Sequence, residues 1–390
     1  MSIASPLNFP EESASAPEPC SGDRGSVAPV SPVLPRAGGE LIEFHHPRSS
    51  GLRVVCMGGG TGLSTLLRGL KRYVRLKGEV PPRGRYISSL SAAVAVSDDG
   101  GSSGKLRRDF KMLSPGDLRN CLVALSENEE LLAQLFQFRF PAESALDGHS
   151  LGNLLLAALN QITGDFGRAI ELCSQLLRTR GTPYPCTGED VQLEAVMDDG
   201  SRLRGETVIH NSKKRIVEVM LAPPHVAASP ELLRAIDEAD LIAIGPGSLF
   251  TSLLPNLLVR GVAEAIAASR AVKVYICNLM TEANESLGLT AAGHVRTLYR
   301  HVGTPVFSYA LINSHPASSE LLARYRLEGA EQIVADLDEI ASLGVTPITG
   351  DFLDEDAGVA RHASERIADA LLGLTSAAHA IHAGIAVRVA

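Results

Sequence analysis

Two glycine-rich segments in this sequence have the composition of phosphate-binding loops. Residues 58–62 follow the apolar run 53–57, and residues 245–248 follow the apolar run 240–244. A backbone without side chains can turn sharply, and free amide N–H groups at the start of a following helix can hold a phosphate. Two such loops suit a ligand that carries two phosphates, or one phosphate and another anion.

The first loop matches neither of the common nucleotide-binding motifs. The dinucleotide fingerprint needs a third glycine where this chain has Leu63, and the Walker A loop needs a lysine that is absent here. The alternative interpretation is a tight strand-to-helix turn without a ligand. The presence of two such loops in one chain favours the functional interpretation.

Two adjacent carboxylates, Asp98 and Asp99, follow a third apolar run at residues 91–97. Beside a phosphate they could coordinate Mg²⁺, with Asp98 as the candidate ligand, or hold ribose hydroxyls. Acids at such positions also commonly cap helices or turns, and the residues do not decide between metal and hydroxyl. The basic segment 105–108 that follows could clamp an anion or form a solvated helix face.

Ser102 lies in a Gly-x-Ser-x-Gly pattern, which is typical of the nucleophile of α/β hydrolases. His149 and Asp147 would supply the other residue types of a catalytic triad. Against a serine hydrolase, two acids directly precede the motif, and the other glycine loop would have no task. We therefore interpret His149 as a packed or capping residue, and Ser150 as the N-cap of an apolar helix over 151–162.

The composition indicates a globular protein and excludes several classes of partner. The 390 residues are 45% hydrophobic and 21% charged, which is ordinary for a chain with a substantial core. A formal charge of −8, no tryptophan and 4% aromatic residues argue against nucleic acid and anionic membranes as partners. The six cysteines form no Cys-x-x-Cys pair, which indicates reduced, mostly buried thiols. Without a membrane-spanning run or a secretory signal, we expect a cytoplasmic protein.

Apolar runs that alternate with helical patterns predict an α/β fold with an open, mostly parallel sheet. Alternating polarity around Asp199-Gly200 predicts a β-hairpin insertion at about residues 191–219. Ligands bind such sheets at the carboxyl ends of the strands, so we expect the loops at 58–62, 98–104 and 245–248 to share one crevice.

The chain divides into three parts by composition. Residues 1–50 are rich in Ser and Pro without any period, which predicts a disordered leader. Residues 51–372 form the predicted single domain, and residues 373–390 form a tail of uncertain order.

Five motifs resemble, in the same order, those of the gluconeogenesis factor (YvcK-like) family, within the superfamily of the 2-phospho-L-lactate transferase CofD. They occupy residues 58–64, 96–104, 115–120, 148–153 and 245–249. The resemblance implies a Rossmann-like three-layer α/β core in a cytoplasmic bacterial protein. It also implies binding of UDP-sugars such as UDP-N-acetylglucosamine, and a role in cell-wall synthesis and cell shape under gluconeogenic growth, with no established turnover.

In that family a tyrosine and an arginine late in the chain grip the nucleotide sugar, and Tyr325 and Arg361 are the matching positions. A phenol ring can stack on uracil, and a guanidinium can hold a diphosphate with two hydrogen bonds. The residues expected to bind the ligand are Gly59, Gly60, Thr61, Gly62, Asp98, Asp99, Ser102, Ser103, Asn153, Gly245, Gly247, Ser248, Tyr325 and Arg361. Binding requires no cofactor, with Mg²⁺ at Asp98 as an option. The expected partners are the UDP-sugar and an unidentified protein of cell-wall synthesis, and a homo-oligomer is left open.

The CofD branch gives an alternative function. There, a transferase moves a phospholactyl-type group from a guanosine diphosphate-linked donor to a deazaflavin, using Mg²⁺. Its acids match Asp98 and Asp99, which would then be catalytic, but the Gly-Gly-Ser-Ser-Gly run after them resembles the regulatory branch. We therefore expect a regulatory binding protein, with the transferase as the alternative and a serine hydrolase as a remote one.

Overall fold

The computed structural model describes residues 51–76, 78–79, 85–127, 129–141, 143–212, 214–283, 285–356 and 358–382. The predicted leader, residues 1–50, lies outside the described residues. So do residues 383–390 of the predicted tail.

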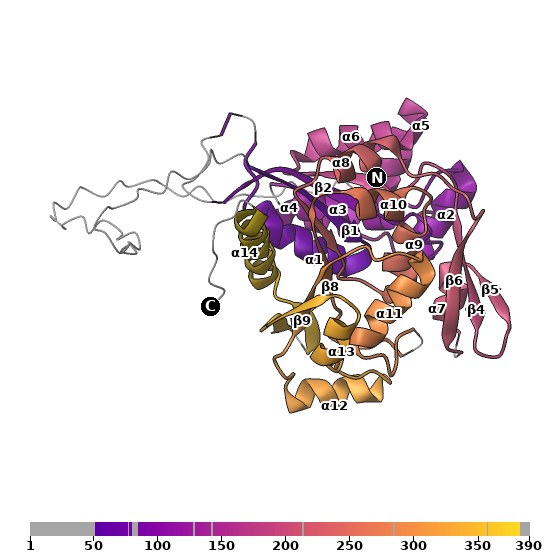
Figure 1. The fold of residues 1–390 in the computed structure, drawn as a ribbon. Helices are drawn as coiled ribbons and strands as arrows, with labels where there is room; N and C mark the ends of the chain where they lie inside the picture. Colours follow the sequence, from indigo (N-terminus) through magenta and orange to yellow (C-terminus); the bar gives the residue numbers. More distant parts are fainter. Residues whose placement is uncertain are drawn as a thin grey trace, which may run out of the picture. The chain divides into compact units, whose positions relative to one another are not determined.

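A seven-stranded sheet lies at the centre of the described part, and all of its strands run parallel (Figure 1). Its strands are β1 (Leu52–Gly58), β2 (Ile87–Val94), β3 (Thr182–Pro185), β7 (Leu241–Ile244), β8 (Val272–Ile276), β9 (Tyr309–Asn313) and β10 (Thr346–Gly350). The strand order is β10-β9-β8-β7-β1-β2-β3. The predicted α/β fold with a mostly parallel sheet is confirmed.

Helices cover both faces of the sheet. The helices, apart from the short α7 described below, are α1 (Gly60–Lys71), α2 (Gly101–Phe110), α3 (Gly116–Leu125), α4 (Glu129–Gln137), α5 (Leu151–Thr163), α6 (Phe166–Leu177), α8 (Pro230–Asp237), the π-helix η1 (Leu249–Leu253), α9 (Leu254–Leu257), α10 (Val262–Ala268), α11 (Ala291–Val302), α12 (Ser319–Leu327), α13 (Leu337–Ser342) and α14 (Ser364–His382). From β1 the chain crosses through α1 to β2 at one side, whereas from β7 it moves through β8 to the other side. Right-handed crossovers in opposite directions place their helices on opposite faces, which gives the expected three layers.

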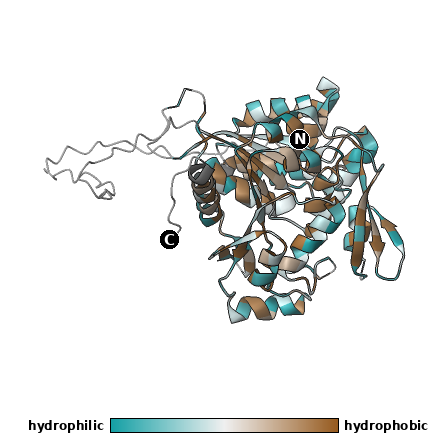
Figure 2. Cartoon of the chain, in the orientation of Figure 1, coloured by the Kyte–Doolittle hydropathy of each residue, from teal (hydrophilic) through white to brown (hydrophobic). Residues whose placement is uncertain are grey.

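The two central strands form because their side chains are apolar on both faces. All four residues of β7 are buried, and so are the last five residues of β1. Strands covered on both faces need a nearly continuous apolar sequence, which is the pattern at residues 53–57 and 240–244. The hydropathy colours agree, since the strands at the centre are largely brown (Figure 2). Strands β1 and β7 are adjacent in the sheet, and each is followed by one of the two glycine loops.

The predicted hairpin insertion is a small antiparallel sheet with three strands in the order β5-β4-β6. Its elements are β4 (Gln192–Met197), β5 (Arg202–Arg204), the short helix α7 (Glu206–His210) and β6 (Ile216–Ala222). The turn between β4 and β5 lies at Asp199-Gly200, as expected, and Gly200 adopts φ +80°. The sequence pattern did not predict α7, because one helical turn is too short to show a period.

Three other elements differ from the sequence pattern. Apolar residues recur with helical spacing over 118–135, but this segment forms two helices, α3 and α4, because the backbone is extended at Ser126, where α3 ends. The short edge strand β3 contains two prolines and was not expected. Helix α14 continues through Leu372, the expected end of the domain, as far as His382. Apolar residues Leu371, Leu372 and Ala378 hold this helix against the core.

Within the described residues, Cys56, Cys121, Cys173, Cys186 and Cys277 are free and buried, as expected for reduced thiols. Cys20 lies outside the described residues. Among the helices in the described ranges, none combines the length and the apolar character needed to cross a membrane.

Candidate functional site

The two glycine loops meet at the centre of the sheet, between β1 and β7, where the strand order reverses although the strands stay parallel. A methyl group built on Gly62 would lie 2.6 Å from the carbonyl oxygen of Pro246, and one built on Gly58 would lie 3.3 Å from the same oxygen. Glycine is required at residue 62 because the two backbones touch. Such a reversal point, at the carboxyl ends of the strands, is where open α/β sheets bind ligands.

Two asparagines fix the relative position of the loops. Asn278, just after β8, accepts a hydrogen bond from the Gly247 amide (3.3 Å) and donates one to the Gly247 carbonyl (2.9 Å). The fully buried Asn256 in α9 donates from its side-chain amide to the carbonyl oxygens of Gly58 (2.8 Å) and Ser252 (2.7 Å). The loops are therefore held rigidly, and neither asparagine has a sequence motif of its own.

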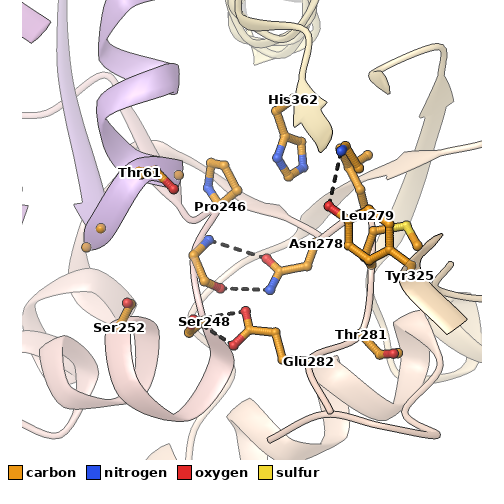
Figure 3. Close-up of a pocket in the computed structure, with 16 residues that line it drawn as sticks. Thr61, Pro246, Ser248, Ser252, Asn278, Leu279, Thr281, Glu282, Tyr325 and His362 are labelled. Atoms are coloured by element: carbon orange, nitrogen blue, oxygen red, sulfur yellow. Dashed lines mark hydrogen bonds between the residues drawn. The ribbon is translucent and has the colours of Figure 1, made fainter. Parts of the chain in front are cut away.

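A cavity of about 320 Å³, here called the glycine-loop pocket, opens between the loops (Figure 3). Its wall comes from residues 59–62, the loop 246–248 with Ser252, the segment 278–282 after β8, Tyr325 of α12, and residues 360 and 362 of β12 (Val359–His362), which pairs with β11 (Leu353–Asp356). This volume lies within the range of small-molecule sites. Segments from five separate parts of the chain thus line one cavity.

One end of the pocket offers backbone amides. Helix α1 begins there, and its N-cap residue, Gly59, has no side chain that could cap the helix. The Gly60 amide donates to Asp117 Oδ2 at 2.7 Å, whereas the amides of Thr61 and Gly62 have no acceptor among the described residues. Unpaired first-turn amides and the positive end of the helix dipole attract an anion. This end of the pocket suits phosphate.

The other end is apolar. Leu279, Met280, Tyr325 and Ala360 line it and belong to a second hydrophobic cluster, separate from the main core. The Tyr325 hydroxyl accepts a hydrogen bond from the Ala360 amide at 3.1 Å, which keeps its own proton available for donation. An apolar wall with one hydroxyl suits a planar, partly polar group such as a nucleobase.

Glu282 places a carboxylate in the wall of the pocket. The Ser248 hydroxyl is 2.9 Å and 2.8 Å from its two oxygens, as the dashed lines in Figure 3 show. Burial and the nearby carboxylate of Glu285 raise the pKa of Glu282 to about 7. Glu285 is itself buried, hydrogen-bonded to Thr251 (3.2 Å), and one of its oxygens has no partner within the described part of the chain.

Further acids lie beside the phosphate end. Burial raises the pKa of Asp117 to about 6, although its bond with the Gly60 amide opposes this change. Burial also raises the pKa of Glu206, and the charges of Asp98 and Asp117 add to the effect. Among the residues that the structure describes, no group of three or more His, Cys, Asp or Glu side chains is arranged to hold a metal.

Of the predicted ligand-binding residues, seven line the pocket: Gly59, Gly60, Thr61, Gly62, Gly247, Ser248 and Tyr325. Gly245 lies directly behind the second loop, with φ +91°. Arg361 does not line the pocket, since neighbouring strand residues point to opposite faces and residues 360 and 362 point inward. Its guanidinium lies 3.5 Å from Asp356 and is 45% exposed.

The other predicted residues, Asp98, Asp99, Ser102, Ser103 and Asn153, lie outside the pocket wall. The carboxylate of Asp98 accepts hydrogen bonds from the Gly100 amide (2.8 Å) and the Ser114 hydroxyl (3.3 Å). Ser103 is buried against Gly116, where an added methyl group would lie 2.6 Å from its hydroxyl. Their roles toward a ligand stay predictions.

Ser102 and His149 do form a pair, with Oγ and Nδ1 separated by 3.1 Å. Ser102 also accepts a hydrogen bond from Asn153 (3.1 Å). Asp147 does not join them, because its carboxylate lies 3.8 Å from Lys105. The serine–histidine contact therefore lacks the acid that orients a triad histidine. Ser150 caps α5 as predicted, accepting from the Asn153 amide.

Asp99 anchors the small antiparallel sheet. One of its oxygens accepts hydrogen bonds from the amide (2.9 Å) and the hydroxyl (2.7 Å) of Thr207, in the first turn of α7. Carboxylates stabilise such helix starts by accepting the free amides.

We expect Asp99→Ala to release α7 while leaving ligand affinity unchanged, because the carboxylate holds Thr207 outside the pocket wall. Hydrogen–deuterium exchange of the amides at 205–211 should become several-fold faster. The matched control is Asp198→Ala, an exposed acid in the β4–β5 turn. Unchanged exchange at 205–211 together with weaker ligand binding would instead assign Asp99 to the ligand.

Sequence reasoning missed Asn278, Glu282 and His362, three polar residues of the pocket wall. A polar segment after β8 was visible in the sequence, and its position at the carboxyl end of a parallel strand was the available signal. His362 had no such signal.

Comparisons with known proteins identify close relatives. A family model described as 2-phospho-L-lactate transferase CofD matches residues 54–353. A Halalkalibacterium halodurans protein named Gluconeogenesis factor is 46% identical over 319 residues, which is 82% of this chain and 95% of the relative. A Bacillus subtilis protein of the same name is 42% identical over 322 residues, covering 83% and 98%. The crystal structure of a Bacillus halodurans protein matches with a TM-score of 0.78 at 45% identity, covering 83% of this chain and 100% of the other.

Proposed function

Because the chain belongs to the gluconeogenesis factor family within the CofD superfamily, we propose that it is a regulatory protein that binds a UDP-sugar in the glycine-loop pocket. The proposed ligand is UDP-N-acetylglucosamine. Binding would report the supply of cell-wall precursor to a protein partner, and so couple cell-wall synthesis and cell shape to gluconeogenic growth in the cytoplasm.

One observation carries this proposal: the two glycine loops meet around a cavity that is anion-attracting at one end and apolar at the other. The free amides of Thr61 and Gly62 would hold the diphosphate. Tyr325, at the apolar end, would contact the uracil ring. A protein that binds its ligand more tightly in one conformation than in another can pass on this occupancy to a partner.

Calorimetric titration with UDP-N-acetylglucosamine tests the proposal. We expect saturable binding with one ligand per chain, and competition by UDP. Tyr325→Ala should weaken binding by about fivefold, because aromatic contacts of this kind are worth roughly 1 kcal/mol. Absence of heat and of any thermal shift at millimolar ligand would reject the UDP-sugar as ligand.

A CofD-type transferase remains the second candidate, favoured by the buried acids beside the phosphate end. Mg²⁺ commonly takes one or two protein carboxylates and completes its shell with phosphate oxygens and water. Asp98 and Asp117, whose charges interact, are the carboxylates that would hold it here. This candidate predicts Mg²⁺-dependent transfer to a deazaflavin, abolished by Asp98→Asn. A protein that binds ligand and shows no transfer would eliminate it.

A further inference from the structure

His362 is a histidine whose two ring nitrogens face different surroundings. It lies at the end of β12 and lines the glycine-loop pocket, which Tyr325 also lines (Figure 3). Its Nε2 is 3.0 Å from the carbonyl oxygen of Cys277, at the end of β8. Burial lowers the pKa of His362 to about 4, so that the ring is neutral under physiological conditions.

The bond with Cys277 fixes the tautomer of this neutral ring. A carbonyl oxygen only accepts hydrogen bonds, so Nε2 must carry the proton. Nδ1 then has a free lone pair and can only accept. Nδ1 makes no hydrogen bond with any residue that the structure describes, and it is not fully buried, so a ligand atom can reach it. The ring thus presents a fixed acceptor to the cavity.

This acceptor lies at the end of the pocket where the base of a bound nucleotide is expected. His362 adjoins the apolar end formed by Leu279, Met280 and Tyr325, whereas the free amides that suit phosphate lie at the other end. Nucleobases differ at the ring nitrogen that such an acceptor would meet. Uracil carries an N3–H donor there, whereas N3 of cytosine is itself an acceptor.

We propose that Nδ1 of His362 accepts a hydrogen bond from N3–H of uracil, and that this contact makes the pocket select uridine over cytidine nucleotides. This inference rests on the proposed function and adds the residue that determines the base. Two acceptors facing each other in a partly buried site leave both without a partner, and this rejects a ligand more effectively than a missing methyl group does.

The tautomer can be tested without ligand. In ¹⁵N-labelled protein at neutral pH, long-range ¹H–¹⁵N spectra separate protonated from unprotonated ring nitrogens. We expect His362 to have a protonated Nε2 and an unprotonated Nδ1, with assignment by the loss of these signals in His362→Gln. A protonated Nδ1 in the free protein would overturn the inference.

Base selection is tested by competition against UDP-N-acetylglucosamine on the wild-type protein, with UDP, CDP and the diphosphate of 3-methyluridine as competitors. UDP should compete about 10- to 100-fold better than either of the other two, because only UDP has the N3–H donor. The methylated competitor keeps both carbonyls of uracil, so it isolates this one hydrogen.

Two variants separate a contact with the base from a structural role. His362→Gln retains a donor for the Cys277 carbonyl and an acceptor for the base, and should keep most of the preference for UDP. His362→Phe has neither and should bind UDP and CDP alike, with its melting temperature measured alongside. Equal binding of UDP, CDP and the methylated analogue to wild type refutes base reading by His362 while the nucleotide pocket stands. Binding of none of them refutes both proposals.

Discussion

Gly62→Ala is expected to lower the affinity for UDP-N-acetylglucosamine by about 10- to 100-fold, corresponding to the loss of about one hydrogen bond to a charged group. The added methyl carbon would lie 2.6 Å from the Pro246 oxygen, 2.8 Å from its carbon and 3.2 Å from the Gly247 amide nitrogen. These neighbours are backbone atoms, so the loops must separate. The amides that converge on the phosphate site would then diverge.

Gly62→Ala is also expected to change the free energy of unfolding, and the sign of this change separates helix propensity from the contact between the loops. Residue 62 is in the first turn of α1, where alanine is intrinsically preferred to glycine by about 1 kcal/mol. We nevertheless expect a net loss of about 1–3 kcal/mol, as for other overpacked sites. Calorimetric binding and thermal unfolding measure the two effects.

Gly188→Ala is the matched control, since a methyl group built on Gly188 meets no atom within 4 Å. It should change neither the affinity nor the melting temperature measurably. If Gly62→Ala binds ligand as well as this control does, the contact between the loops has no part in ligand binding.

Binding of UDP-N-acetylglucosamine is expected to weaken as the pH rises through about 7, because Glu282 loses its proton there. The pKa of Glu282 is raised from 4.5 to about 7, so its side chain is largely neutral below this value and negative above it. None of the described residues that line the pocket is a lysine or an arginine that could offset this charge. The ligand's diphosphate favours the protonated form, and binding therefore takes up a proton.

Other titratable groups surround Glu282. Glu285 lies close by and is buried, and it raises the pKa of His210, whose ring is 3.9 Å from its carboxylate. Asp117, with a pKa of about 6, lies on the opposite side, at the Gly60 amide. Asp117 is mostly ionised above pH 7, but His210 also changes charge with pH, so the variant Glu282→Gln is needed to assign the change to Glu282.

The affinity is expected to fall about threefold to tenfold between pH 6 and pH 8. About tenfold is the most that the uptake of one proton by a group with a pKa of about 7 allows over this range. Glu282→Gln should abolish most of this dependence and bind at pH 8 at least as tightly as wild type at pH 6. Titrations in two buffers of different ionisation enthalpy measure the proton uptake. Glu171→Gln, an exposed acid on α6, is the control and should behave as wild type. An unchanged pH profile in Glu282→Gln would place the diphosphate away from Glu282.

The parts of the fold that the sequence predicted are those whose apolar pattern is complete within one segment. The central strands β1 and β7 and helix α5 belong to this class, since their apolar pattern is visible in the residues. Edge strand β3 and helix α7 were not predictable, because they exist through their neighbours. Four residues with two prolines make a strand only where β2 is already present to pair with them.

The residues of the site also fall into those with a local sequence signal and those whose role depends on a distant segment. Both glycine loops could be found because tight glycine-rich turns have a characteristic local composition. His362 could not, because it acts through the backbone carbonyl of Cys277 in a distant segment. The position of Asn278 after a parallel strand was a signal, but its contact with Gly247 was not visible in the sequence. The hydrogen bond between Asp99 and Thr207 could not be predicted either, because it depends on how the inserted sheet folds back, and the role of Asp99 toward a ligand stays a prediction.

Strands β1 and β7 pair in the sheet although they lie far apart in the sequence, so the pairing of β1 is delayed while the rest of the chain is synthesised. Arg53 and Asp240, which bond at the start of these strands, are 187 residues apart. At about 5–20 residues per second this separation takes roughly 10 to 40 s. Throughout that time β1 is an apolar strand with one unpaired edge, a state that invites misassociation. We therefore expect nascent chains arrested before residue 240 to engage a chaperone, and release to follow once β7 has emerged.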